Sequence, residues 1–574
     1  MNHTNYIWEI QKVDDSLIEL LKQQLKISVP LAKVLGLRGI KDFESASAYF
    51  RPKWESFHDG FKMKDMKVSV ERVNKAISKE QNILIYGDYD VDGTCSVAIM
   101  KIFLKSIGGN IYSYQPDREI EGYGISLKSV EWMVANKIDI IIALDCGIKD
   151  FKSAKAIKDA KMDLIICDHH KPSEKLPECF SILNPKQNGC NYPFKDLCGC
   201  GIGFKLIQCY AKNYKVEIDY SPIIQLTAIA TTADVVPLKD ENRLITYFGL
   251  KAINKNPIPA LKKIFELSLL KGEISSSDLV FKIAPRINAA GRLSSAEKAT
   301  NFLISDEKEC GLLSSEIEQM NDKRKEIDQQ VTEEALLQLK NQPINRATNL
   351  VYSPNWHKGV VGIVASRIIE KYYKPTIVLT GSEEILTGSV RSVKGFDVYK
   401  VLVKFKNYFT KFGGHNFAAG LSLKKENLNL FFRAFEDEVK STIKQELKCP
   451  KFKIDSHLKL NSLIFDSKKQ DFSKTYRIIK QMEPFGLSNP KPIFLFKNLI
   501  LNRPPRIVGK KHLKLNFTDD EKKIVIDGIW FNSSSFSTQI KGAKYIDVVA
   551  SLTENFFLGQ LSLQLMVNDV KIVK

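Results

Sequence analysis

The sequence predicts a protein of the α/β class, in which two α/β domains are joined by a long helix and followed by a β-rich domain. Between residues 79 and 303, apolar runs of strand length alternate with segments of helix length, which is typical of a parallel sheet. After residue 450, short apolar runs alternate with turns, which is typical of a separate β-domain. A chain of 574 residues is long enough for several such hydrophobic cores.

The same patterns set the expected boundaries. Leucines at helical spacing near the start predict a helical arm that lies on the first α/β domain. A continuously helical, highly charged stretch after Leu303 predicts a helix that links the two α/β domains. The expected segments are an arm at 1–78, a first α/β domain at 79–303, a connecting helix at 304–345, a second α/β domain at 346–445 and a β-rich domain at 450–574.

Composition narrows the class of protein. The chain has 85 Lys and Arg against 66 Asp and Glu, and the resulting net charge of +19 favours a polyanionic partner, although a coding bias toward Lys gives the same surplus. No apolar run approaches the roughly 18 residues of a membrane span, and the first residues lack a secretory signal. The ten cysteines are scattered, as in proteins with reduced thiols. We therefore expect a cytoplasmic protein without membrane contact.

Three of the cysteines, Cys190, Cys198 and Cys200, lie close together in the sequence. Their spacing lacks the paired Cys-x-x-Cys knuckle of structural zinc sites, and no histidine follows nearby. A zinc site at this position is therefore disfavoured.

The most informative stretch is Ile83–Thr94, where an apolar run stops at three carboxylates spaced two residues apart, Asp88, Asp90 and Asp92. The run predicts a buried strand followed by a helix, which places the carboxylates at the edge of the sheet where open α/β folds bind ligands. Clustered carboxylates repel one another, and a divalent cation relieves this repulsion. The alternative is a solvated acidic turn that only caps the helix.

The next two apolar runs end in residues of the same kind, Asp145 and the sequence Asp168-His169-His170. Parallel strands place their carboxyl ends on one edge, so these groups are expected to converge on the first three carboxylates. Asp234, after a further apolar run, offers one more ligand. Oxygen ligands with one or two imidazoles favour Mn²⁺ or Mg²⁺, and two such ions can activate water and stabilise the leaving oxygen of a phosphoryl displacement.

Glycine-rich segments elsewhere are suited to an anion. Pro116–Gly124 contains Arg118, whose guanidinium can hold a phosphate together with backbone N–H groups, and a plain surface loop is the alternative. Trp356–Gly362 contains His357 just before a helix whose N-terminal amides favour an anion. Further donors and close backbone approaches come from Gly388–Ser392 and Gly413–Gly420.

The last segment alternates strand-like runs with turns and is interrupted by one helix at 472–482. Basic residues in this segment favour an OB-like β-barrel that binds a single strand through phosphate and aromatic contacts, while periodicity and charge alone leave a generic β-barrel as the alternative. These basic residues are Arg503, Arg506, Lys510, Lys511 and Lys514.

Several of these segments resemble the DHH phosphoesterase superfamily. The resemblance rests on Asp88–Gly93, Leu144–Gly147, Asp168–His170 and Thr232–Val235. More closely, the chain resembles the RecJ family of bacterial single-strand-specific DNA exonucleases over nearly its whole length. The segments that select this family are Leu37–Ile40, Pro285–Arg292, Trp356–Arg367, Gly413–His415 and Glu483–Gly486. Relatives in this family carry an OB domain, and Gly509–Leu515 and Asn555–Gly559 resemble its blocks.

The resemblance implies a role for each site residue. The residues that match the metal ligands of the superfamily are Asp90, Asp92, Asp145, His169 and Asp234. Asp88 and Asp168 belong to the same catalytic cluster, and His170 is expected to orient or protonate an oxygen near the metals. The expected substrate-binding residues are Arg118, Arg286, Asn288, Arg292, His357, Arg391, Ser392, Gly413, Gly414 and His415.

The resemblance further implies an exonuclease that uses two Mn²⁺ or Mg²⁺ ions to degrade single-stranded DNA from its 5′ end to 5′ mononucleotides, in DNA repair and recombination. It implies a helicase and single-strand-binding protein as partners, and because no heptad pattern calls for a dimer we expect a monomer. One alternative is an enzyme of the same superfamily that acts on short oligonucleotides or cyclic dinucleotides, which the long chain and terminal domain disfavour. The other is a catalytically inactive DNA-binding scaffold, which the intact metal motifs disfavour.

Overall fold

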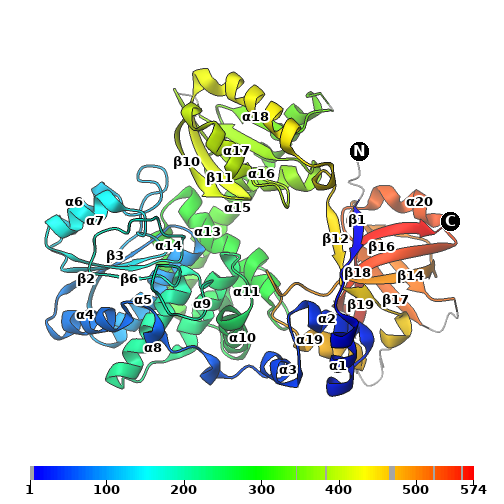
Figure 1. Cartoon of the computed structure of the whole chain (residues 1–574), viewed down its shortest axis with the longest axis horizontal. Helices are drawn as coiled ribbons and strands as arrows, with labels where there is room; N and C mark the ends of the chain where they lie inside the picture. Colours follow the sequence, from blue (N-terminus) through cyan, green and yellow to red (C-terminus); the bar gives the residue numbers. More distant parts are fainter. Residues whose placement is uncertain are drawn as a thin grey trace. The chain divides into compact units, whose positions relative to one another are not determined.

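The computed structural model describes residues 6–343, 345–381, 384–463, 472–520, 524–557 and 560–573. The chain forms two compact units, one of Trp54–Lys448 and one that combines Met1–Lys53 with Cys449–Lys574. The larger unit contains both α/β domains, and the smaller one contains the β-rich domain (Figure 1). The predicted α/β class is confirmed.

The first α/β domain is built on a five-stranded parallel sheet. Its strands are β2 (Asn82–Gly87), β3 (Asn110–Tyr114), β4 (Ile140–Leu144), β5 (Asp163–Cys167) and β6 (Ser181–Leu183), in the order β3-β2-β4-β5-β6. Its helices are α4 (Met66–Ser78), α5 (Val91–Ser106), α6 (Leu127–Ala135), α7 (Phe151–Asp159) and α8 (Gly199–Tyr214). Ile83 and Ile85 share a core with α4, α5 and α8, whereas Leu84 and Tyr86 pack with α6 and α7 on the opposite face (Figure 1). Strands buried on both faces account for the continuous apolar runs.

A helical region follows the sheet and completes this domain. It contains α9 (Tyr220–Ala233), α10 (Asp240–Lys255), α11 (Pro259–Leu267), α13 (Ala284–Leu293) and α14 (Ala296–Ile304). A π-helical turn over Leu279–Ile283 leads into α13, where Pro285 in the first turn needs no backbone donor. The apolar run before Asp234 is the helix α9.

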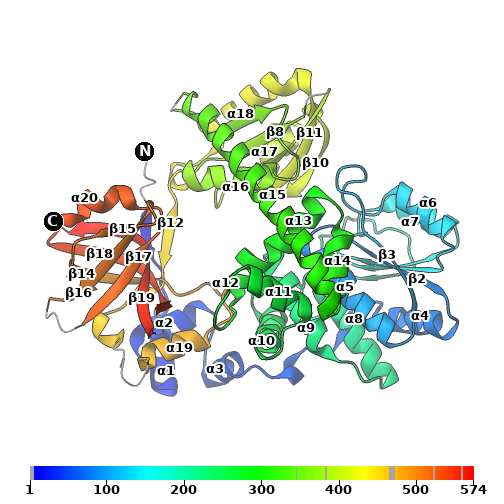
Figure 2. The same cartoon turned by 180° about the vertical axis from the view of Figure 1, so that it is seen from behind.

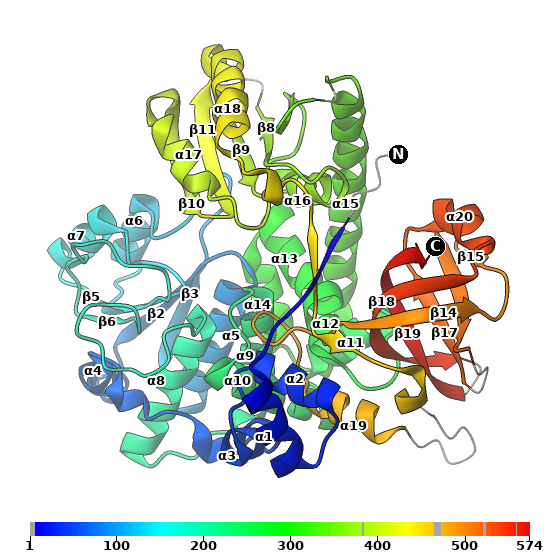
Figure 3. The same ribbon diagram turned by 45° about the vertical axis from the view of Figure 1, so that its right-hand side comes forward.

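The connecting helix α15 spans Glu307–Lys340 and leads to the second α/β domain (Figure 2). This domain has the strands β7 (Asn349–Ser353), β8 (Thr376–Thr380), β9 (Ile385–Arg391), β10 (Phe409–His415) and β11 (Ala418–Lys424), in the order β10-β11-β9-β8-β7. Its helices are α16 (Val361–Lys371), α17 (Val398–Lys404) and α18 (Leu428–Thr442). The end of α15 and α16 cover one face of this sheet, and α17 and α18 cover the other (Figure 3).

The smaller unit joins the two ends of the chain. The strands β13 (Ser456–His457), β14 (Phe494–Leu501), β15 (Arg506–Val508), β16 (His512–Thr518), β17 (Val525–Trp530), β18 (Tyr545–Phe557) and β19 (Gln560–Val573) form one sheet. Because β14 pairs with both β18 and β16, this sheet curls into a partial ring. In addition, β1 (Ile7–Ile10) pairs in parallel with β12 (Lys451–Ile454).

The N-terminal helices α1 (Asp15–Leu25), α2 (Val29–Leu37) and α3 (Phe43–Phe50) belong to this smaller unit. Leu21 and Leu35 share a core with Phe494 of β14 and with Ile479 of α19 (Lys474–Gln481). The expectation that the arm lies on the first α/β domain was therefore wrong for residues 6–53. The last part of the predicted arm, from Trp54 through α4, packs on that domain. Helical periodicity identifies an apolar face but not its partner.

A buried ion pair links the arm to the C-terminal segment. Arg38 Nη1 lies 3.0 Å from Asp455 Oδ1, with both side chains at most 5% exposed, and Arg38 Nη2 donates to the carbonyl of Pro490. The remaining oxygen of Asp455 accepts the backbone N–H of Ile493 at 2.8 Å. Arg38 lies in one of the segments that resemble the RecJ family.

We expect Arg38→Ala to destabilise the smaller unit by about 3–5 kcal/mol, because it leaves the Asp455 carboxylate buried without its cation. Urea unfolding, with limited proteolysis to locate the unit that opens, measures this loss. Lys41→Ala is the matched control, since Lys41 is exposed just beyond the same helix. Equal stability of the two variants would show that the pair contributes nothing beyond surface charge.

Candidate active site

Three neighbouring strands bring the predicted metal residues together. Asp88 follows β2, Asp145 follows β4 and Asp168 follows β5, and these strands are adjacent and parallel. Ligand atoms of three groups of residues lie within 4.8 Å of one another. The groups are Asp88 with Asp90 and Asp145, Asp145 with His169 and His170, and Asp92 with His169 and Asp234. All seven of these residues were expected at the site from the sequence.

Asp90 and Asp92 each serve a helix as well as the cluster. Asp90 Oδ1 accepts the backbone N–H groups of Asp92 and Gly93 at 2.9 and 3.1 Å and so caps α5. The carboxylate of Asp92 accepts the N–H groups of Gly199 and Cys200 at 2.7 and 2.8 Å, at the start of α8. The capping alternative is thus correct in part, but a cap alone does not explain the convergence of the other acids and histidines.

The start of α8 has no room for a side chain at its first residue. A Cβ on Gly199 would lie 2.5 Å from Cβ and 2.8 Å from Cα of Asp145, so the helix must retreat to accept it. A Cβ on Gly201 would meet the flexible side chain of Leu197 at 3.3 Å. Gly199 therefore helps to position two acidic residues. Its N–H donates to the carboxylate of Asp92, and its lack of a Cβ lets α8 pack closely against Asp145.

We expect Gly199→Ala to cost about 1–3 kcal/mol in stability and to weaken metal binding about tenfold or more, as for residues that orient metal ligands. Gly201→Ala is the matched control on the same helix and should remain close to wild type. Urea unfolding and metal titration by calorimetry measure the two effects. Equal metal affinity in both variants would contradict the proposed role of Gly199.

Buried atoms without partners mark this cluster as suited to a cation. His169 Nε2 lies 3.2 Å from Asp145 Oδ1, and His169 Nδ1 lies 3.7 Å from Asp234 Oδ2. Among the described residues, none of these four atoms has a hydrogen-bond partner, and Asp88 Oδ1 is in the same state. Buried polar atoms normally find partners, so this set of carboxylates and one imidazole fits a divalent cation.

The ionisation of the cluster reflects burial and crowding of like charges. Burial, and then the charge of Asp90, raises the pKa of Asp92 to about 6. The pKa values of Asp145 and Asp234 are raised well above their usual range, by burial and then by the charge of Asp92. Burial, together with the neighbouring His170, lowers the pKa of His169 to about 3, so its ring is neutral and able to bind a metal.

His170 has a different environment from His169. Its Nδ1 lies 2.8 Å from Asp168 Oδ1 and 3.1 Å from the Tyr123 hydroxyl, which also donates to the carbonyl of Asp145. Burial lowers the pKa of His170, but the hydrogen bond and charge of Asp168 outweigh it and raise this pKa above its ordinary value. In turn, bonds from His170 outweigh the burial of Asp168 and lower its pKa to about 2. The contact with Asp168 thus favours the protonated form of His170.

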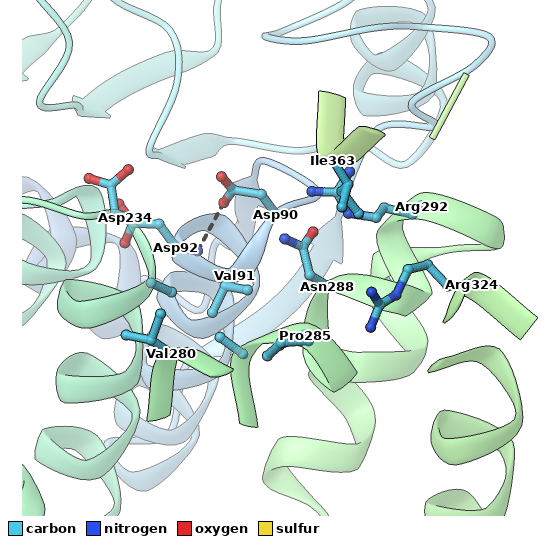
Figure 4. A pocket seen from close by; sticks show the side chains of 12 residues that line it. Asp90, Val91, Asp92, Asp234, Val280, Pro285, Asn288, Arg292, Arg324 and Ile363 are labelled. Carbon is cyan, nitrogen blue, oxygen red and sulfur yellow. Dashed lines mark hydrogen bonds between the residues drawn. The ribbon is translucent and has the colours of Figure 1, made fainter. Parts of the chain in front are cut away.

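A pocket of about 260 Å³ opens beside the cluster. In the view of Figure 4, Asn288 lies between the carboxylates of Asp90 and Asp92 and the guanidinium groups of Arg292 and Arg324. Asn288 and Arg292 were expected from the sequence, but Arg324 lies in the middle of α15 and was not. Arg292 Nη1 also donates to the carbonyl of Gly359 at 2.7 Å, which ties α13 to the loop before α16.

The other expected substrate-binding residues differ in how many hydrogen bonds their side chains already make within the protein. Arg118 lies over the ring of Tyr89 at 5.0 Å, and Arg391 Nη1 donates to Ser389 Oγ at 2.8 Å. In contrast, Arg286 donates to both carboxylate oxygens of Glu318 and to a backbone carbonyl, and it does not line the pocket. This environment favours a structural role for Arg286.

Residues of the second α/β domain show the same division. Ser392 Oγ donates to the carbonyl of Phe396, so Ser389 is the serine that faces Arg391. His357 Nδ1 accepts the N–H of Gly359, and His415 lies at the end of β10. Gly413 and Gly414 have no side chain with which to bind substrate. A Cβ on Gly414 would lie 2.4 Å from the carbonyl oxygen of Ala418, so the two strands approach closely there.

The cysteines near the site are not arranged as metal ligands. The thiols of Cys198 and Cys200 face the hydroxyl groups of Thr231 and Thr227. Within the described ranges, no group of three possible ligands contains a cysteine. These thiols are therefore placed as buried side chains that pack against hydroxyl groups.

The sheet of the smaller unit presents basic and apolar side chains to solvent. Ile507 and Phe531 are half exposed, and His512 packs edge-on against Phe531 at 4.9 Å. Lys514 lies 3.3 Å from Asp527. Exposed rings and cations on such a sheet are the usual contacts for single-stranded nucleic acid.

The fold and the carboxylate–histidine cluster define a phosphoesterase of the DHH class. A family model described as "DHH family, N-terminal domain" matches residues 82–231, and the "DHHA1 domain" model matches residues 346–441. The "RecJ OB domain" model matches residues 466–569.

Comparison with individual proteins identifies one family within this class. The chain is 34% identical to the single-stranded-DNA-specific exonuclease RecJ of Bacillus subtilis, over 98% of this chain and 71% of that protein. It is 30% identical to RecJ of Escherichia coli, over 93% of this chain and 94% of the relative. The chain therefore belongs to the RecJ family.

A solved structure shows the same fold. The crystal structure of RecJ from Thermus thermophilus in complex with Mn²⁺ matches with a TM-score of 0.83 at 22% identity, over 99% of this chain and 80% of the other. The same RecJ in complex with Mg²⁺ matches with a TM-score of 0.77. Among the described residues, no helix is both long and apolar enough to cross a bilayer.

Proposed function

We propose that the protein is a metal-dependent exonuclease that hydrolyses single-stranded DNA from its 5′ end and releases 5′ mononucleotides. The observation that carries this proposal is the cluster of acids and histidines with unpartnered buried atoms, found in a chain that matches RecJ proteins over most of its length. The repulsion among these carboxylates favours divalent cations, and the family provides the substrate and polarity.

The metal ligands are Asp90, Asp92, Asp145, His169 and Asp234, and Asp88 completes the cluster. These residues would hold two Mn²⁺ or Mg²⁺ ions, which when bound would lower the pKa of a water and offset negative charge on the phosphoryl group. Gly199 and Cys200 fix the Asp92 carboxylate, and Asp168 holds the ring of His170. His170, whose protonated form is favoured by its contact with Asp168, donates a proton toward the leaving 3′ oxygen.

The remaining cations hold the DNA strand. Arg118 and Arg391, with Ser389 in place of the expected Ser392, bind the 5′-terminal phosphate, and Arg292 with Asn288 lies beside the scissile phosphate. The sheet of the smaller unit binds the single strand farther along. Implied partners are a helicase and single-strand-binding protein, and we propose a monomer that acts in the cytoplasm.

The test is digestion of one long single strand that carries a label at either its 5′ or its 3′ end, with Mn²⁺, Mg²⁺ or EDTA, beside a matching duplex. We expect rapid release of a labelled mononucleotide from the 5′ end alone, abolished by EDTA and by Asp168→Ala and absent on the duplex. Cleavage limited to dinucleotides would instead indicate an oligonucleotide hydrolase. Equal activity of wild type and Asp168→Ala would reveal a contaminating nuclease.

A further inference from the structure

The connecting helix α15 contributes a residue to the catalytic pocket. Its charged sequence predicts a spacer, yet one face of the helix is buried and carries Asn321, Arg324 and Asp328. Arg324 is 9% exposed, and its guanidinium lines the pocket together with Asp90, Asn288 and Arg292 (Figure 4). A solvated spacer does not require a buried arginine whose charged group faces a cavity.

The neighbours of Arg324 orient its guanidinium without neutralising it fully. Arg324 Nη2 donates to Asn321 Oδ1 at 2.7 Å, one turn earlier on the helix. Asp328, one turn later, lies 3.8 Å from Arg324 Nη1, but its Oδ2 atom is 2.6 Å from Nη2 of Arg367 in α16. Because Arg367 holds Asp328 closely, and a guanidinium has five donors, Arg324 keeps donors for an anion in the pocket.

The position of Arg324 in the pocket determines which phosphate of a bound strand it can contact. The pocket runs from Asp90, Asp92 and Asp234 past Asn288 and Arg292 to Arg324, and neither Arg118 nor Arg391 belongs to its lining. Arg292 lies within electrostatic reach of Arg118, Arg324 and Arg391, since burial and then these three cations lower its pKa to about 10. In the view of Figure 4, Arg324 lies on the far side of Asn288 from the carboxylates of Asp90 and Asp92, so an anion beside it is separate from one held at the metal residues.

We propose that this pocket is the subsite for the phosphodiester that follows the scissile one, and that Arg324 is its phosphate ligand. This inference rests on the proposed function, because it requires a strand whose 5′ end is held by Arg118 and Arg391. A strand one nucleotide longer than the minimal substrate reaches Arg324, whereas a 5′-phosphorylated dinucleotide has a single phosphodiester and does not. Asn321 and Asp328 act as positioning residues for this arginine.

Substrate length tests the subsite. We expect Arg324→Gln to lower kcat/KM by about tenfold to a hundredfold on 5′-phosphorylated trinucleotides and longer strands, which is the usual loss for one charge-assisted phosphate contact. On the 5′-phosphorylated dinucleotide the variant should stay within about twofold of wild type, which also shows that it is folded. Lys323→Gln removes the same charge from an exposed position in the same turn and should match wild type on every length.

A neutral phosphate provides an independent readout. A methylphosphonate at the second phosphodiester of a trinucleotide should slow the wild-type protein about as much as Arg324→Gln slows it on the natural strand. The same modification should have no further effect on Arg324→Gln, since the contact is already lost. A purely structural role for Arg324 predicts additive losses instead.

The outcomes separate the two proposals. If Arg324→Gln slows the dinucleotide as much as longer strands, or matches wild type on all of them, the subsite is wrong while the exonuclease activity stands. If wild type cleaves no strand from its 5′ end, both the proposed function and this subsite are overturned.

Discussion

Asp145→Asn is expected to lower strand cleavage by roughly a hundredfold to a thousandfold at fixed Mn²⁺, and to raise the thermal stability of the metal-free protein. The first effect follows because Asp145 belongs to two of the three groups of possible metal ligands. The second follows because burial and the charges of Asp92 and Asp90 raise its pKa. A carboxyl group whose pKa is raised on folding loses its contribution to stability as the pH rises through the folded pKa.

The expected gain in thermal stability of Asp145→Asn depends on pH. The melting temperature of Asp145→Asn should exceed that of wild type in EDTA by an amount that grows from pH 5 to pH 8, because only wild type must ionise the buried carboxyl group. Asp159→Asn, an exposed change at the end of α7, serves as the control and should show neither effect. A constant difference across pH would mean that the repulsion among the acids is relieved without metal.

Cleavage at low Mn²⁺ should fall as the pH drops through about 6, and higher Mn²⁺ should move this fall to lower pH. The pKa of Asp92 is raised to about 6, and those of Asp145 and Asp234 are raised as well, so protons compete with the metal for these oxygens. Each pH unit below such a pKa weakens metal binding by about tenfold for every proton displaced.

The measurement is a set of pH–rate profiles at two Mn²⁺ concentrations, with metal affinity from calorimetry at the same pH values. Removal of metal with EDTA should abolish cleavage at every pH. Superimposable profiles at the two Mn²⁺ concentrations would assign the acidic limb to a group other than the metal ligands, such as one that acts on the substrate.

Much of the fold follows from local sequence patterns. Strands β2, β4 and β5 are buried on both faces, so each appears as a continuous apolar run followed by an acidic residue. Strand β6 has three residues and leaves no such signal. The partner of the N-terminal helices was missed for another reason, because their contacts reach residues more than 400 positions away and no local period encodes them.

Most acids and histidines of the site were predictable because parallel strands bring their ends together, whereas Asp234 follows the helix α9. The residues that position or surround these acids and histidines were not predictable from the sequence. The glycines around Cys198 are the signal for the close approach of α8 to Asp92 and Asp145, but the cysteines drew attention to zinc instead. Arg324 was hidden within a helix rich in exposed charge, and Arg286 lies in a matched motif yet pairs with Glu318. Charge in a sequence does not reveal whether a side chain faces solvent, a cavity or an ion pair.

The pairing of β1 with β12 joins segments that are synthesised far apart in time. The arm emerges from the ribosome first, but its partner strands follow only after residues 54–448, which takes roughly 20–80 s at the usual rate of about 5–20 residues per second. During this interval the apolar faces of α1, α2 and α3 have no native partner. The larger unit can fold in the meantime, so we expect the native core of the arm to form only after the strands that follow residue 448 have been synthesised.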